Sequence, residues 1–175
     1  MSSIRIMETA DLNAIDEIFN QAIEAKFSTA FTMPLSGEER LSWFHDHDPA
    51  HYPVFIYHEE NAIAGFAFFS PYRKGRKALR STAEISYFVH SGFHRRGIGS
   101  RLMEHAISVA PEYNFKTLIA IIMEPNTASI ALLNKYDFSL WGNMPGILEV
   151  EGGKHNHQYY GLHVYDNKQI PGPLI

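Results

Sequence analysis

One stretch of the sequence joins a strand, a turn and a helix, and it constrains the fold more than any other. Residues 84–90 alternate β-prone side chains with others, which predicts a strand with at least one buried face. From Ile98 onward the apolar residues recur at helical intervals, so a helix begins there. Arginines and glycines lie between the two elements. Because glycine lets a ligand approach the backbone and a helix start presents unpaired N–H groups, the junction predicts a phosphate-binding turn.

Length and composition predict a single domain. The chain has 175 residues, and we expect one domain over residues 1–167 and an extended tail over residues 168–175. The formal net charge of −4 argues against nucleic acid or an anionic membrane as a partner. The sequence has no cysteine, which excludes disulfides, thiolate metal sites and a cysteine nucleophile. No apolar run approaches a membrane span, so we expect no membrane partner and a cytoplasmic location.

The remaining segments predict strands and helices around one sheet. An almost wholly apolar run at residues 117–123 has the length of a strand that is buried on both faces. The capping-box pattern at residues 36–39 starts a helix. The other predicted elements are strands at residues 3–6, 52–58, 62–70, 138–141 and 158–165, helices at residues 9–26 and 126–136, and loops at residues 27–34, 71–81 and 142–153. This order predicts an α/β (α+β) chain with a central mixed sheet and helices on both faces.

Two motifs at the expected separation resemble one family. Residues 94–99 resemble motif A of the GNAT acyl-CoA N-acyltransferases, which is usually Gln or Arg, two variable residues, Gly, one variable residue, then Gly or Ala; here His94 takes the first place. Residues 126–138 resemble the motif that follows it in that superfamily, often Asn-x-x-Ser-x-x-Leu-Tyr-x-Lys-x-Gly-Phe. Similarity to the phosphinothricin and methionine sulfoximine acetyltransferase branch extends over residues 4–164, through residues 28–31, 71–72, 82–84 and 154–155.

The resemblance implies a fold and a reaction. The expected fold is the GNAT fold, a central mixed, mostly antiparallel twisted sheet of about seven strands flanked by about four helices. The expected activity is acetyl transfer from acetyl-CoA to the primary amine of a small amino-acid-like substrate, by direct attack in a ternary complex. The expected assembly is a homodimer. Two alternatives stay open, an N-acetyltransferase of proteins or peptides and a non-catalytic acyl-CoA sensor.

The same resemblance implies a CoA site along the opening stretch. Backbone N–H groups of residues 95–100 would hold the diphosphate, with the helix dipole adding to the attraction. The strand edge would pair with the pantetheine arm and supply an oxyanion donor. The expected cofactor-binding residues are Tyr87, Phe88, Val89, Arg95, Arg96, Gly97, Ile98, Gly99, Ser100, Asn126 and Ser129.

Glu84 and His155 are the candidate catalytic residues. An ammonium nucleophile must lose a proton before attack, and Glu84 lies on the strand about 15 Å before the phosphate turn at ~3.3 Å per residue. The alternative is a solvated strand carboxylate. His155 matches a histidine of the branch, but the alignment can shift to His157, and a loop histidine without a role is an equal alternative. Many GNAT enzymes carry a tyrosine that acts as a general acid at the position of Leu133. Tyr136 lies three residues later and is not expected to act in its place.

The acceptor side rests on loop residues. Arg76 resembles an arginine of the branch that could bind a substrate carboxylate, with Lys74 beside it as a second candidate. Phe27, Thr29 and Phe31 are expected to line the acceptor pocket, or else to form a packed loop. No metal is expected, because the histidine clusters lack a third ligand at a recognised spacing. Long loops around residues 27–36 and 142–153 favour a closed pocket for a small acceptor over a peptide groove.

Overall fold

A single seven-stranded sheet organises the molecule. The computed structural model of the chain describes residues 2–60 and 62–164, so the predicted tail at residues 168–175 lies outside the described residues. The strands follow the order β1-β2-β3-β4-β5-β7-β6 across the sheet. They are β1 (Ser3–Ile6), β2 (Val54–Glu59), β3 (Ala62–Pro71), β4 (Thr82–Val89), β5 (Thr117–Met123), β6 (Ser139–Val150) and β7 (Gly153–His163). All neighbouring pairs are antiparallel except β4 with β5.

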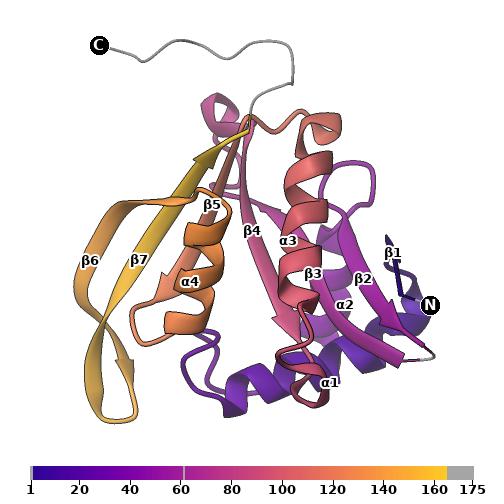
Figure 1. Ribbon diagram of the computed structural model, residues 1–175, viewed down its shortest axis with the longest axis horizontal. Helices are drawn as coiled ribbons and strands as arrows, with labels where there is room; N and C mark the ends of the chain where they lie inside the picture. The colour runs from indigo at the N-terminus through magenta and orange to yellow at the C-terminus, as the bar shows by residue number, and fades with distance from the viewer. Residues whose placement is uncertain (1, 61, 165–175) are drawn as a thin grey trace.

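Helices cover both faces of this sheet (Figure 1). The described α-helices are α1 (Leu12–Glu24), α2 (Gly37–Asp46), α3 (Ile98–Val109) and α4 (Thr127–Lys135). In the view of Figure 1, α3 and α4 lie in front of the sheet and α1 and α2 lie behind it. The predicted capping box starts α2, because Ser36 Oγ accepts from the Glu39 N–H and the Glu39 carboxylate accepts from the Ser36 N–H. The predicted mixed, mostly antiparallel α/β fold is confirmed.

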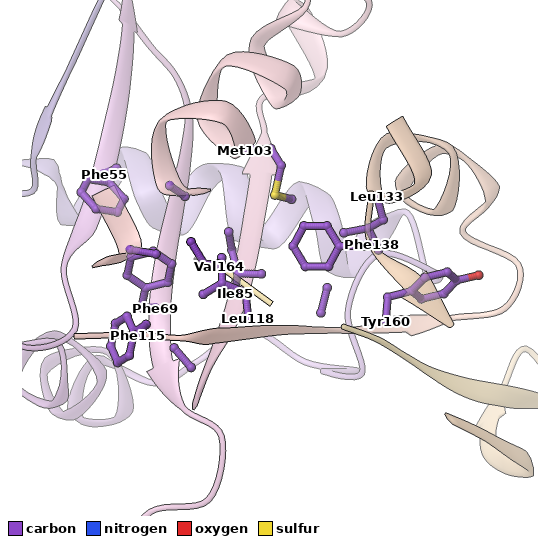
Figure 2. Packing of buried hydrophobic residues seen from close by; sticks show 14 residues of the cluster. Phe55, Phe69, Ile85, Met103, Phe115, Leu118, Leu133, Phe138, Tyr160 and Val164 are labelled. Atoms are coloured by element: carbon purple, nitrogen blue, oxygen red, sulfur yellow. The ribbon is translucent and has the colours of Figure 1, made fainter. Parts of the chain in front are cut away.

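Alternation along the central strands builds a separate core on each face. On the face of α3 and α4, Met103 and Leu133 flank the ring of Phe138, and all three are buried (Figure 2). On the opposite face, Ile15 of α1 packs with Phe66 and Phe68 of β3. A central strand that serves two cores must be apolar on both sides, which explains the long hydrophobic runs of β3 and β5.

β4 and β5 are paired over only part of their length. β4 pairs with β3 along its whole length, but with β5 only where Thr82–Glu84 lie beside residues 117–119. Beyond Glu84 the two parallel strands diverge, as Figure 1 shows. Residues 86–89 therefore have no strand neighbour on the β5 side, and their backbone is open to an extended ligand there.

The prediction of a loop at residues 142–153 is wrong. β6 continues to Val150 and forms a long hairpin with β7, so His155 and His157 lie on a strand. Most β6 side chains are exposed at the sheet edge and the register slips twice, so the strand carries no hydrophobic alternation in its sequence. Glu151 and Gly152 both have positive φ, 54° and 71°, which suits a two-residue hairpin turn.

Candidate active site

The turn between β4 and α3 brings its backbone to the surface. Arg95 and Gly97 both adopt left-handed φ values, 62° and 78°, and Gly97 is the residue that caps α3. Glycine adopts this conformation without strain, whereas other residues pay about 1–2 kcal/mol. No heavy atom lies within 4 Å of where a Cβ would stand on Gly97, so the space over the turn is open. The unpaired N–H groups of the first turn of α3 are thus accessible to an anion.

A cavity of about 570 Å³ extends from this turn along β4. All predicted cofactor residues except Arg96 line it. The Arg96 guanidinium lies instead over the Phe93 ring and 3.5 Å from the Glu59 carboxylate. Residues outside the predicted cofactor set complete the wall: Gln21, Ala22, Ala25, Ser28, Ser91, Phe93, His94, Ala128 and Leu132.

Two side chains outside the predicted cofactor set shape the turn. Gln21 of α1 accepts a hydrogen bond from the Ser91 N–H at 2.8 Å. His94 Nε2 lies 3.0 Å from the Val89 carbonyl oxygen, which can only accept, so Nε2 donates. This bond ties the first position of the motif to the end of β4. His94 therefore supports the turn although it replaces the usual Gln or Arg.

The second motif closes the other side of the cavity. The Asn126 side chain caps α4 by accepting from the Ser129 N–H at 3.2 Å. Ser129 Oγ in turn accepts from the Tyr87 hydroxyl at 2.9 Å. Burial raises the pKa of Tyr87, and the bond to Ser129 opposes that rise. Tyr136 donates to the Ser100 carbonyl at 2.8 Å, a contact that joins α4 to α3.

Glu84 lies at the point where β4 and β5 separate. It pairs with Ser70 of β3 on one side and with Ile119 of β5 on the other. Burial raises the pKa of its carboxyl group. Within residues 2–60 and 62–164, no hydrogen bond or ion pair to that carboxyl is found. A half-buried carboxylate without a charged partner is a stronger base than an exposed one.

A second cavity has a volume of about 230 Å³, and Glu84 itself lines neither this cavity nor the first. Ile119, the β5 neighbour of Glu84, lines this cavity. Its other walls come from the segment after β3 and from the β6–β7 hairpin: Tyr72, Arg73, Trp141, Gly142, Met144, Tyr159 and Tyr160. Aromatic rings and one arginine therefore surround a space whose wall includes the β5 neighbour of the candidate base.

The family model of the acetyltransferase (GNAT) family matches residues 14–138. The chain belongs to the GNAT acetyltransferase family. Among curated GNAT relatives, YwnH of Bacillus subtilis, provisionally named a phosphinothricin acetyltransferase, is 32% identical over 91% of this chain and 97% of its own length. The L-amino acid N-acyltransferase MnaT of Escherichia coli is 30% identical over 83% of this chain and 84% of its own length.

A solved GNAT structure matches the whole architecture. The phosphinothricin acetyltransferase of Sinorhizobium meliloti, crystallised with acetyl-CoA, superposes with a TM-score of 0.88 at 25% identity. The match covers 98% of this chain and 93% of that one. Family membership confirms the prediction of a GNAT acetyltransferase whose co-substrate is acetyl-CoA.

The first cavity of this GNAT domain fits acetyl-CoA by its donor groups. CoA is an elongated anion, and the cavity combines an open turn of backbone donors with an unpaired strand edge. A methyl group at Gly99 would stand 3.3 Å from the Tyr87 ring and from Leu132, so glycine also lets the start of α3 approach β4 and α4 closely.

In this GNAT sheet, His155 and His157 of the β6–β7 hairpin lie several residues along β7 from the position that is paired, through β5, with Glu84. Glu84 is level with Gly161 through Ile119, and His155 is six residues farther along β7, about 20 Å at ~3.3 Å per residue. The His155 ring packs edge-on against Phe27, with 5.2 Å between centroids. His157 lies between Met123 and Met144, and burial lowers its pKa.

The five predicted acceptor residues line neither cavity. Lys74 forms an exposed ion pair with Asp46 at 2.9 Å, and Arg76 caps a short 3₁₀ turn at Lys77–Leu79. Phe31 packs against Phe19, and the Thr29 hydroxyl accepts from the Phe31 N–H. Arg73, which the sequence did not single out, lines the second cavity instead.

No group of three or more His, Cys, Asp or Glu side chains in residues 2–60 and 62–164 is arranged to hold a metal ion. No helix in the same residues combines the length and apolar character that a membrane crossing requires.

Proposed function

We propose that this GNAT enzyme transfers the acetyl group of acetyl-CoA to the primary amine of a small amino-acid-like molecule, with both substrates bound together. The position of Glu84 carries the proposal. Glu84 is three residues before Tyr87, which lines the first cavity, and beside Ile119, which lines the second. Glu84 thus lies on the strand between a residue that lines a nucleotide-sized groove and a strand neighbour that lines a small pocket.

The turn and the strand edge would bind the co-substrate. N–H groups of residues 95–100 would hold the diphosphate, and the α3 dipole favours that negative charge. Residues 86–89 would bind the extended arm through their unpaired backbone edge. A backbone N–H on that edge would also stabilise negative charge on the carbonyl oxygen during attack. Acetyl-CoA supplies the activated acetyl carbon.

Glu84 would act as the general base. Its carboxylate accepts a proton from the substrate ammonium, directly or through one water, and so frees the nitrogen lone pair for attack. Burial favours this role, because it raises the pKa of the carboxyl toward the pH at which the enzyme works. We assign no proton transfer to His155 or His157, because the register separates both from Glu84.

Arg73 would bind the acceptor carboxylate in the second cavity. A guanidinium offers a planar pair of donors that match a carboxylate, and aromatic walls suit an apolar side chain. The names of the relatives support this class of acceptor, since phosphinothricin and L-amino acids each carry an amine and a carboxylate. Arg76 and Lys74 stay predictions for the same role.

A thiol-release assay with acetyl-CoA tests the reaction. Free amino acids, matched peptides and simple amines are offered at equal concentration. Release with free amino acids supports the proposal, release with peptides alone supports a peptide acetyltransferase, and CoA binding without release supports a sensor.

The Glu84→Gln variant tests the base. We expect kcat to fall by about 10²–10⁴-fold while the acetyl-CoA Kd changes less than twofold. Glu104→Gln, which alters an exposed carboxylate on α3, is the matched control and should behave as wild type. Unchanged turnover in Glu84→Gln would refute the assignment.

We further propose that the chain forms a homodimer in the cytoplasm. The family resemblance supports a dimer, and the outermost strand β6 exposes the apolar side chains of Leu140, Trp141, Met144 and Ile147. Light scattering after size exclusion measures the mass. A monomeric mass at micromolar concentration would refute the dimer, and Ile147→Glu should dissociate it if β6 is the interface. Fractionation of cells tests the location.

A further inference from the structure

A buried histidine and a serine stand next to the candidate base. His47 caps the C-terminal end of α2 and is only 8% exposed. Its Nε2 lies 3.3 Å from the hydroxyl of Ser70, the residue directly opposite Glu84 on β3. Opposite residues of an antiparallel pair project from the same face, with Cβ atoms about 4.5–5.5 Å apart. The Ser70 hydroxyl and the Glu84 carboxyl are therefore neighbours on the face that α1 and α2 cover.

The surroundings determine which ring nitrogen carries the hydrogen. His47 Nδ1 lies 2.6 Å from the Trp43 carbonyl oxygen, which can only accept, so Nδ1 is the donor. Burial lowers the pKa of His47, and the nearby Trp43 carbonyl and Asp46 only partly oppose this. The neutral ring leaves Nε2 bare, so Nε2 accepts the hydroxyl hydrogen of Ser70. Packing against the rings of Trp43 and Phe68, at 4.3 and 5.0 Å between centroids, holds this orientation.

This arrangement changes what Ser70 can offer to a ligand. A serine hydroxyl has one hydrogen, and His47 takes it. The Ser70 oxygen then presents only lone pairs to the space beside Glu84. The Ser70 oxygen and the Glu84 carboxylate are then both acceptors, and neither offers a hydrogen. Such a pair selects a ligand group with several N–H bonds, such as an ammonium.

We propose that Ser70, oriented by His47, binds the acceptor nitrogen beside Glu84 and selects amines over alcohols. The inference rests on the proposed function. One N–H proton of the ammonium passes to the Glu84 carboxylate, and the nitrogen bonds to the acetyl carbon. The C–S bond then breaks with its electron pair on the CoA sulfur, and this thiolate takes a second proton from the nitrogen. The third N–H donates to Ser70 throughout and directs the lone pair. An alcohol that gives up its only proton has no hydrogen left for Ser70. His47 is a positioning residue, because it acts through Ser70.

Steady-state kinetics with the best amino-acid acceptor test the inference. We expect Ser70→Ala to raise the KM for the amine about tenfold, the effect of one lost hydrogen bond to a charged group, with the acetyl-CoA KM within twofold of wild type. His47→Asn can still bond the Trp43 carbonyl but places nothing at Nε2, so it should match Ser70→Ala. His47→Gln places an amide near Nε2 and should restore the KM to within about threefold. His45→Asn, an exposed histidine on the same helix, is the control.

The outcomes separate the inference from the function on which it rests. An amine KM within twofold of wild type in Ser70→Ala, together with turnover lost in Glu84→Gln, overturns the role of Ser70 and leaves the proposed function intact. Full turnover in Glu84→Gln overturns the proposed function and the inference with it. An equal loss for His47→Gln and His47→Asn with wild-type kinetics in Ser70→Ala shows a merely structural histidine and also overturns the inference.

Discussion

The ring of Trp141 lies against Gly161, and this contact predicts a large effect of adding one methyl group in Gly161→Ala. Gly161 is level with Ile119 and hence with Glu84, and the Trp141 ring covers it. A Cβ at Gly161 would stand 2.1 Å from Trp141 Cε3, closer than any real contact. Gly161→Ala therefore forces the indole off β7. The ring also lines the second cavity, so the acceptor pocket should change with it.

The cost follows from the area that the indole loses. Trp141 is 46% exposed. About half of a side chain that can bury ~250 Å² is then covered, which at ~25 cal/mol/Å² contributes about 3 kcal/mol. Replacing glycine by alanine within a strand by itself raises the free energy of unfolding by about 0.5–1 kcal/mol. The net loss is about 2 kcal/mol, and since a domain of this size shifts by about 2–4 °C per kcal/mol, the Tm should fall by about 4–8 °C.

Thermal unfolding and tryptophan fluorescence measure the two halves of this prediction. The chain has two tryptophans, so a Trp43→Phe background leaves emission from Trp141 alone. Gly142→Ala is the matched control on the partner strand, because its Cβ would meet the nearest atom at an ordinary 3.7 Å. We expect a red-shifted emission, the lower Tm and a raised acceptor KM in Gly161→Ala, and an unchanged emission and Tm in Gly142→Ala. A Gly161→Ala protein with unchanged emission and a Tm no lower than that of the control would refute the reasoning.

Three further predictions test the turn, the cavity wall and the base. Gly97→Ala should lower the free energy of unfolding by about 1–2 kcal/mol because φ is 78° there, whereas Gly37→Ala, at an open position without positive φ, should not; urea unfolding compares the two. Tyr87→Phe loses the bond to Ser129 and should cost about 1 kcal/mol in the same assay. Burial raises the pKa of Glu84, so its stabilising contribution is full below the unfolded pKa and is lost as pH rises through the folded pKa. Glu84→Gln should therefore exceed wild type in Tm at pH 7, and this excess should vanish below about pH 4 in melts across pH. An excess that persists in acid would contradict the linkage.

Local sequence determined the elements that act over a few residues. The turn at Gly97, the cap at Asn126 and the strand of Glu84 could be predicted. Each depends only on neighbouring residues: a glycine in the left-handed region, an asparagine that caps a helix, and a change from alternating to helical spacing. The first cavity followed from these, because its main walls are those same two helix starts. Its α1 wall, with Gln21 and Ala25, carries no motif and was missed.

The acceptor side depends on segments that meet only in the folded chain. Residues 142–153 have no apolar alternation, since an edge strand is held by backbone pairing, and so the hairpin was read as a loop. Within one basic loop, the sequence could not distinguish Arg73, which lines the cavity, from Lys74, which pairs with Asp46.

The turn before α3 and the carboxylate upstream of it were thus determined by sequence, because both belong to one continuous strand–turn–helix unit. Only the tertiary structure decided what stands around that carboxylate. The separation of β4 from β5, the indole over Gly161 and the contact of His47 with Ser70 each join residues far apart in the chain. Such contacts leave no periodic or local signal, because the packing of whole elements, and not the preference of any neighbouring residue, brings them together.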